Sequence, residues 1–137
     1  MTAKTDTPEG TVELFSQLLE EGRLDALLGL YEEDATFVPE PGRVVSGHPA
    51  IRGELEQLVA IDPRMSGSVE RVLESGDTAL VAYRWQMLAT APDGTPIRQG
   101  GLSADVLRRR SDGSWRVIID DPYGAADPIG GQGPSSA

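Results

Sequence analysis

Cysteine is absent from the 137-residue sequence, and histidine occurs once, at His48. Without cysteine the chain has no disulfide and no thiolate metal site, and one histidine cannot complete the usual zinc ligand set. The glycine-rich motifs that bind phosphate groups or dinucleotides are also absent. We therefore expect no metal and no cofactor, so that any chemistry is proton transfer by carboxyl groups. His48, which directly precedes Pro49, is expected to face solvent.

Long apolar runs and an excess of positive charge are missing too. No segment approaches the roughly 20 apolar residues that a membrane-spanning helix needs, and residues 1–10 lack the apolar core of a secretory signal. Lys and Arg number 12 against 22 Asp and Glu, which gives a net charge of −10. Such a field repels phosphate backbones and anionic membranes. We expect a cytoplasmic protein with no nucleic-acid partner and no membrane partner.

The rest of the composition is that of one globular domain. Hydrophobic residues make up 39% and charged residues 25% of the chain, which is an ordinary balance, and the length suits a single domain. We predict an N-terminal arm over residues 1–7, the domain over residues 8–124 and a flexible tail over residues 125–137. Gly, Pro, Ser and Ala dominate that last segment, a composition typical of flexible linkers.

The N-terminal half predicts three helices. Thr7 and Pro8 form a helix start, and Gly22 ends this first helix. A second short helix is predicted from Leu24 to Tyr31, because its apolar residues recur at helical spacing, and a short strand follows over residues 35–38. The third helix begins near Pro49. The three apolar stripes are Val12, Phe15, Leu18 and Leu19; Leu24, Leu27, Leu28 and Tyr31; and Ile51, Leu55, Leu58 and Val59.

The C-terminal half predicts four strands, at about residues 66–74, 78–90, 97–110 and 115–121. Turn sequences rich in Asp and Gly separate them, and such turns between apolar runs are typical of hairpins. The fold class is therefore α+β: a curved antiparallel β-sheet wrapped round the three N-terminal helices. The pair Gly100-Gly101 marks a bend in the third strand. A sheet bent there forms a cone with a cavity inside.

The predicted strand over residues 78–90 is apolar on both faces. The helices can cover only one face of the sheet, so the other face needs a second partner. We predict a homodimer that packs through the sheet.

The order of these elements resembles a known superfamily. Two helices, the segment Tyr31–Ala35, a helix start at Gly47–Ile51 and a strand entry at Asp112–Val117 follow one another as in nuclear transport factor 2-like proteins. The likeness extends over about residues 8–124 and is nearest to the SnoaL-like and ketosteroid-isomerase-like branch. It implies a conical cavity, and in some relatives a role beside polyketide or enediyne antibiotic pathways. Members include isomerases, cyclases, epoxide hydrolases, binding proteins and assembly modules, so the fold alone does not define an activity.

Asp120 and Asp121 end the last predicted strand and are the candidate catalytic residues. Alternation along the strand puts Trp115 and Asp121 on one face and Asp120 on the other. If Trp115 faces the cavity, Asp121 does too, although a bulge would exchange the two aspartates. A carboxyl group in an apolar pocket has a raised pKa and can transfer protons near neutral pH. The simpler alternative is a solvated carboxylate in the turn before Pro122.

A third carboxylate, Asp105, lies in the middle of a predicted strand among small and apolar residues. A charge buried there must be paired or neutralised. We expect an ion pair with Arg84 or Arg116, and the alternative is a cavity acid.

Aromatic and apolar side chains form the candidate ligand site. The predicted ligand-binding residues are Tyr83, Trp85, Met87, Gln99, Phe15, Trp115 and Tyr123. Tyr83, Trp85 and Met87 share one strand face and suit a flat, apolar molecule, unless they simply fill the core. The first helix carries Phe15 where steroid isomerases, by the resemblance, place a tyrosine, so steroid isomerisation is not expected.

The expected function combines the site and the resemblance. We expect the protein to bind a small apolar, polyketide-like ligand and to catalyse its cyclisation, isomerisation or hydration without a cofactor. The alternative is a non-catalytic ligand-binding or dimeric assembly module, with the cone filled by side chains.

Overall fold

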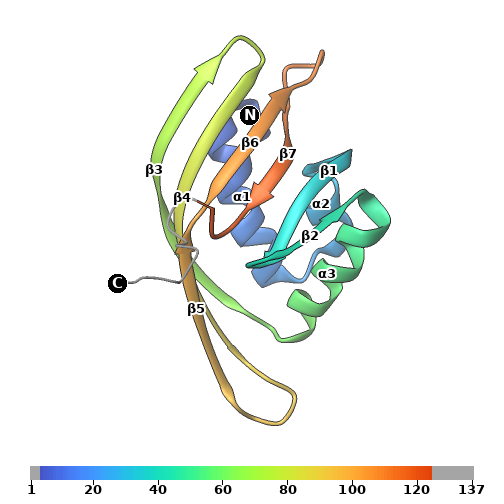
Figure 1. The fold of residues 1–137 in the computed structure, drawn as a ribbon, viewed down its shortest axis with the longest axis vertical. Helices are drawn as coiled ribbons and strands as arrows, with labels where there is room; N and C mark the ends of the chain where they lie inside the picture. Colours follow the sequence, from blue (N-terminus) through green and yellow to red (C-terminus); the bar gives the residue numbers. More distant parts are fainter. Residues whose placement is uncertain (1–3, 125–137) are drawn as a thin grey trace.

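The computed structural model describes residues 4–124, in which helices cover the concave side of a curved sheet (Figure 1). The segments predicted as the start of the arm (residues 1–3) and as the tail (residues 125–137) lie outside the described residues. Residues Lys4–Asp6 form one 3₁₀ turn, η1. The elements that follow are α1 (Pro8–Glu21), α2 (Leu24–Leu28), β1 (Tyr31–Glu40), β2 (Arg43–Ser46), α3 (His48–Ala60), β3 (Arg64–Ser75), β4 (Thr78–Thr90), β5 (Pro96–Leu102), β6 (Ala104–Arg109) and β7 (Trp115–Asp121).

Helix α1 begins and ends at the residues that the sequence indicates. The Thr7 hydroxyl accepts a hydrogen bond from the Gly10 amide at 3.0 Å, and Pro8 occupies a first-turn position that needs no donor. Gly22 ends the helix in the left-handed conformation, with φ of 70°. The buried side chains of α1 include Leu18 and Leu19, which belong to the core.

Helix α2 is shorter than predicted, since it ends at Leu28 and Tyr31 already begins strand β1. The spacing of the leucines is helical, but Tyr31 belongs to the sheet because it pairs with a strand that is distant in the sequence. Tyr31 is paired in parallel with Val117 of β7, and the Val117 amide donates to the Leu30 carbonyl at 2.8 Å. The predicted strand over residues 35–38 is the middle of β1.

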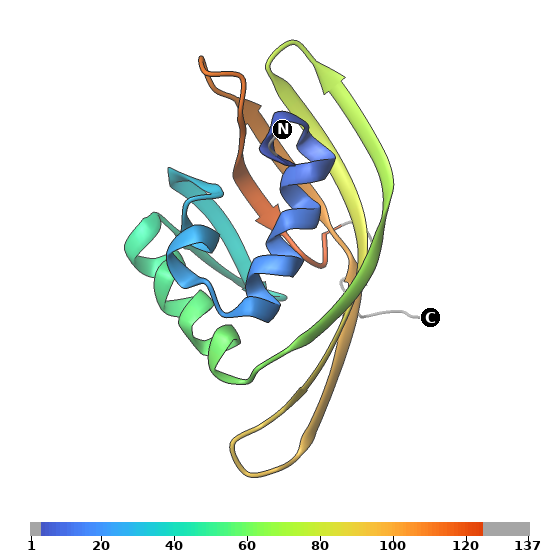
Figure 2. The same cartoon turned by 180° about the vertical axis from the view of Figure 1, so that it is seen from behind.

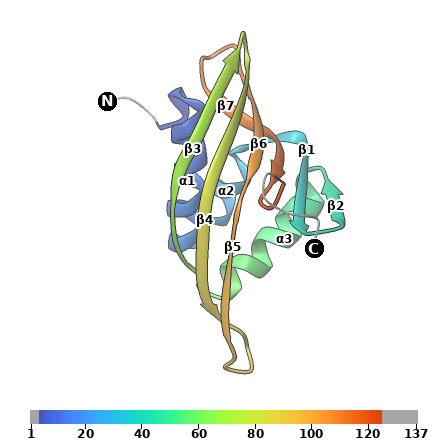
Figure 3. The same cartoon turned by 60° about the vertical axis from the view of Figure 1, so that its left-hand side comes forward.

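The sheet has the strand order β2-β1-β7-β6-β4-β3, and β5 pairs with the outer part of β4. The α+β class with a curved sheet is thereby confirmed, with one amendment: β1 and β7 run parallel, whereas the other pairs are antiparallel. The predicted strand over residues 97–110 is divided at Ser103 into β5 and β6. The β4–β5 hairpin extends well beyond the body of the domain (Figure 3).

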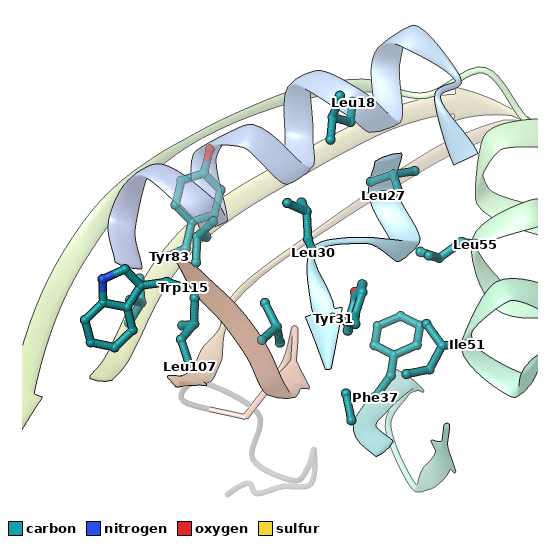
Figure 4. Packing of buried hydrophobic residues seen from close by; sticks show 14 of the residues in the cluster. Leu18, Leu27, Leu30, Tyr31, Phe37, Ile51, Leu55, Tyr83, Leu107 and Trp115 are labelled. Atoms are coloured by element: carbon teal, nitrogen blue, oxygen red, sulfur yellow. The ribbon is translucent and has the colours of Figure 1, made fainter. Parts of the chain in front are cut away.

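The core lies between the three helices and the concave face of the sheet (Figures 2 and 4). Leu27 of α2, Ile51 and Leu55 of α3, and Val81 and Leu107 of the sheet have no exposed surface. Removal of such side chains from water is the main favourable contribution to folding. Among residues 4–124, no helix is both long and apolar enough to span a membrane.

The convex face of the sheet carries large apolar side chains that remain exposed. Leu73, Leu80 and Ile119 have 53%, 36% and 42% of their surface accessible. Register pairs connect Leu73 to Leu80, Leu80 to Val106 and Val106 to Ile119. We call this row of four residues, which crosses β3, β4, β6 and β7, the convex apolar row.

Candidate functional site

A pocket of about 110 Å³ lies between α1 and the concave face of the sheet, and we call it the inner pocket. Most of its wall is apolar, as in small-molecule sites generally. The lining residues are Val12, Phe15, Ser16, Leu19, Phe37, Pro39, Leu58, Met65, Tyr83, Trp85, Met87, Gln99, Ser103, Asp105, Val117, Asp120, Pro122 and Tyr123. The aromatic residues therefore do not fill the cone completely.

Six of the seven side chains predicted to contact a ligand line the inner pocket: Phe15, Tyr83, Trp85, Met87, Gln99 and Tyr123. The exception is Trp115, which is only 2% exposed and packs at the far end of the core from Phe37 (Figure 4). The Arg109 guanidinium lies 5.7 Å from the centre of its ring. Trp115 is thus a core residue, and its expected place in the cavity is wrong.

The side chains of the two candidate aspartates point to opposite faces of the sheet. Asp120 lines the inner pocket, and Asp121 does not. Val106 is paired with Ile119, but the next pair joins Leu107 to Val117, so Ile118 is an additional residue in β7. This bulge reverses the alternation of side chains beyond it. The expectation that Asp121 shares the face of Trp115 is therefore wrong. Asp121 instead accepts a hydrogen bond from the Tyr123 amide at 3.2 Å.

Asp105 is the second carboxyl group of the inner pocket, and its side chain is 5% exposed. The predicted ion pair is wrong, because Arg84 pairs with Glu70 at 3.5 Å and Arg116 donates to the Trp115 carbonyl at 3.1 Å. The expected alternative, a cavity acid, agrees with the geometry. Burial and the nearby Asp120 carboxylate raise the pKa of Asp105 well above its ordinary value.

Asp105 and Asp120 are register partners on β6 and β7, and both line the inner pocket. Oδ2 of Asp105 accepts a hydrogen bond from the Ser103 hydroxyl at 2.8 Å. Oδ1 of Asp105 is buried and has no hydrogen-bond partner among the described residues. Burial raises the pKa of both carboxyl groups, so the pair favours a state in which it holds a proton.

Tyr31 supports Asp120 from the side away from the inner pocket, since its hydroxyl donates to Asp120 Oδ2 at 2.5 Å. Burial raises the pKa of Asp120, while Asp105 and the hydrogen bond from Tyr31 oppose this rise by stabilising the carboxylate. The Tyr31 ring is 2% exposed and packs edge-on against Phe15 and Phe37, with both ring centres at 6.3 Å. Sequence reasoning missed Tyr31, because 89 residues separate it from Asp120.

His48 also belongs to the support of this site. Its Nε2 lies 2.9 Å from the Tyr31 carbonyl oxygen, and the side chain is half-buried. The expectation that His48 faces solvent is therefore wrong. This contact joins the start of α3 to the start of β1, which fixes the backbone of Tyr31.

Trp85 and Tyr123 form an aromatic corner of the inner pocket. The Trp85 indole donates to the Pro122 carbonyl at 2.7 Å, and the two rings meet edge-on with centres 5.7 Å apart. Gly101 leaves room for this contact, since a Cβ there would lie 2.9 Å from the Pro122 oxygen and 3.3 Å from the indole nitrogen. Gly100 and Gly101 lie inside β5 in regular pairing with β4, and the strand is divided at Ser103 instead. The role of Gly101 is the close approach of β5 to the end of β7.

Comparison with known proteins identifies the family. A model of the SnoaL-like domain matches residues 12–118, so the chain belongs to the SnoaL-like domain family within the nuclear transport factor 2-like superfamily. The resemblance drawn from the order of sequence elements is thereby confirmed. No curated protein matches the chain by sequence.

Solved structures share the fold at low sequence identity. A protein from Novosphingobium aromaticivorans, proposed to be a scytalone dehydratase, has a TM-score of 0.72 at 18% identity, with 82% of this chain and 77% of that chain covered. A conserved protein from Planctomyces limnophilus has a TM-score of 0.73 at 18% identity, covering 82% and 88%. The epoxide hydrolase/cyclase-like enzyme SalBIII, described in pyran ring formation in salinomycin, has a TM-score of 0.59 at 20% identity, covering 82% and 85%.

Proposed function

We propose that the protein binds a small, mostly apolar, polyketide-like molecule in the inner pocket and catalyses its cyclisation, isomerisation or hydration without a cofactor. The observation that carries this proposal is the pair of neighbouring carboxyl groups, Asp105 and Asp120, in the wall of a mostly apolar pocket. In this proposal Asp105 holds a proton and Asp120 is ionised. The family supports a ligand-binding role, and the names of two neighbours with dehydratase and cyclase chemistry suggest the reaction class.

Asp120 acts as the base in this proposal. Its carboxylate removes a proton from the ligand, for example from a hydroxyl group whose oxygen then attacks an electrophilic carbon. The proton on Asp105 is delivered to the oxygen on which negative charge develops, which leaves Asp105 ionised and Asp120 protonated. Transfer of that proton from Asp120 to Asp105 then returns the pair to its starting state. Tyr31 positions Asp120, and Ser103 positions Asp105.

A matched pair of variants tests the acid/base role. Material that copurifies in the pocket is identified by native mass spectrometry, and turnover is then measured on it and on a panel of polyketide-like epoxy alcohols and hydroxy ketones. Asp120→Asn is expected to reduce turnover by a factor of about 10² to 10⁴. Asp121→Asn, next to it but outside the inner pocket, is expected to leave turnover nearly unchanged. A folded Asp120→Asn variant with full turnover would reject the proposal in favour of a non-catalytic binding role.

We further propose that two copies pack through the convex apolar row in the cytoplasm, as the sequence predicts. The row crosses four strands, and its exposed leucine and isoleucine side chains require a cover. One side of it carries Arg108 and Arg116, and the other carries Asp121 and Arg71. A two-fold axis along the row places Arg108 and Arg116 opposite the partner's Asp121, which favours a second copy as the occupant.

A further inference from the structure

A second, larger space of about 470 Å³ lies outside the inner pocket, and we call it the outer chamber. It is bounded by the end of β1, by β2, by the second half of α3 and by the β4–β5 hairpin, which projects past α3 (Figure 1). The lining residues are Phe37, Pro39, Glu40, Arg43, Glu54, Gln57, Leu58, Ala60, Ile61, Met87, Pro92, Ile97 and Gln99.

The two spaces adjoin each other. Phe37, Pro39, Leu58, Met87 and Gln99 line both of them. Four of these five side chains are apolar, so the boundary between the spaces is apolar with one amide group. A ligand that occupies both spaces would pass along this boundary from Asp105 and Asp120 to the outer chamber.

The charges of the outer chamber sum to a negative value. The Arg43 guanidinium donates to both oxygens of Glu54, at 2.9 and 2.7 Å, and to Glu40 at 3.3 Å. Arg43 lowers the pKa of Glu54, so that carboxylate stays ionised at neutral pH. One cation thus faces two carboxylates, and it is already engaged by both. An incoming anion would have to displace Glu54 from a two-point hydrogen bond, which is among the stronger polar contacts in proteins.

Neutral hydrogen-bonding groups remain available in this chamber. The side chains of Gln57 and Gln99 line it and are exposed. Each amide offers both donors and an acceptor, which suits hydroxyl and carbonyl groups. The remaining wall is apolar, from Pro92 and Ile97 of the hairpin to Ile61 after α3.

We propose that the outer chamber is a second subsite, which takes an uncharged arm bearing hydroxyl or carbonyl groups on the ligand whose reacting part occupies the inner pocket. This inference rests on the proposed function and narrows its substrate class. The substrate is an elongated, electrically neutral molecule, apolar at the reacting end and oxygenated at the other. Free carboxylic acids and phosphate-bearing carriers are disfavoured by the charge of the chamber.

Two probes of equal length test this charge preference: 4-phenylbutan-1-ol, which is neutral, and 4-phenylbutanoate, which is an anion at pH 7. Their affinities are measured by calorimetry and by NMR titration of the backbone amides of residues 54–58 and 97–99. We expect the alcohol to bind at least tenfold more tightly than the carboxylate and to shift both groups of amides. Equal or tighter binding of the carboxylate, or no binding of the alcohol, would overturn the proposal.

Substitutions in the outer chamber test whether the charge preference arises there. The double substitution Glu40→Gln and Glu54→Gln frees Arg43, so the affinity for 4-phenylbutanoate is expected to rise about tenfold while that for the alcohol changes less than twofold. Glu74→Gln on the distant strand β3 removes a negative charge as well and is expected to change neither affinity. An equal gain in Glu74→Gln would refute a local effect. Turnover by Asp120→Asn separately tests the proposed function, since that variant is expected to keep its affinity for the alcohol.

Discussion

Asp105 lies in surroundings unlike those of an ordinary surface carboxylate. Its neighbours are Ser103, which donates to Oδ2, and Asp120, its register partner on β7. The Ser103 hydroxyl also accepts a hydrogen bond from the Tyr83 amide at 3.1 Å. This second bond orients the Ser103 hydroxyl towards Asp105.

The raised pKa of Asp105 predicts a characteristic pH dependence of stability. The unfolded chain releases this proton near pH 4, whereas the folded chain retains it. The stabilisation from this group is therefore complete below pH 4 and is lost as the pH rises towards the folded pKa. Asp105→Asn keeps the shape and the donor but has no proton to lose. Relative to this variant, the wild type is expected to lose up to about 1.4 kcal/mol of stability per pH unit.

Urea unfolding of both proteins between pH 4 and pH 9 measures this difference, because titrating groups distant from the Asp105–Asp120 pair affect both chains alike. Parallel curves for the wild type and Asp105→Asn would show that Asp105 is ionised in the folded protein.

Tyr31→Phe tests the support of Asp120 by a single hydroxyl group. The variant keeps the ring contacts with Phe15 and Phe37 but leaves Asp120 Oδ2 without its donor. We expect a loss of about 1 to 2 kcal/mol of stability and a higher pKa for Asp120, since Tyr31 stabilises the carboxylate. Carbon-13 NMR titration of the aspartate carboxyl groups reports the pKa directly. An Asp120 signal that titrates as in the wild type would contradict the assigned role of Tyr31.

At the scale of elements, the boundaries of strands with strong local signals were predictable. The strands over residues 78–90 and 115–121 have their predicted bounds, because turn sequences with glycine delimit them. The spacing of Tyr31 from Leu24 and Leu28 predicts a helix, because its partner in the sheet, Val117, is remote in sequence. The bulge at Ile118 depends on the pairing of β7 with β6, which no local pattern encodes. Asp120 and Asp121 were therefore predictable as candidates, but which of the two faces the inner pocket was not.

The contact of β5 with the end of β7 depends on Gly101. In Gly101→Ala, the new Cβ lies too close to the Pro122 oxygen and the indole nitrogen, so the Trp85–Pro122 hydrogen bond is expected to break. We expect a loss of about 1 to 3 kcal/mol of stability and a red shift of Trp fluorescence.

Gly53→Ala in α3 provides a control in which stability is expected to rise rather than fall. No atom lies within 4 Å of a Cβ at this position, and alanine in a helix is more stable than glycine by about 0.5 to 1 kcal/mol. Urea unfolding measures both variants. A Gly101→Ala variant as stable as the wild type would show that the close approach of β5 to Pro122 is unimportant.

At the scale of the whole molecule, the sheet divides its two faces between two tasks. The concave face carries the inner pocket, and the convex face carries the apolar row proposed as the contact between two copies. Leu80 lies within this row, on β4. Leu80→Lys introduces a charge there without touching the pocket, so we expect monomers with unchanged ligand affinity. Sedimentation velocity at micromolar concentration measures the oligomeric state of both proteins. A monomeric wild type would contradict the proposed dimer.

The open sheet has one further consequence, which concerns aggregation. Strands β2 and β3 end the main strand order, so within residues 4–124 each has one edge without a neighbouring strand, and an exposed edge can pair with another molecule. Strand β3 opposes this with the charges of Glu70, Arg71 and Glu74 and with a bulge between Val69 and Arg71. The net charge of −10 adds repulsion between molecules. This repulsion vanishes near pH 4.4, the isoelectric point of the sequence, where strand-edge pairing and turbidity are expected to be greatest.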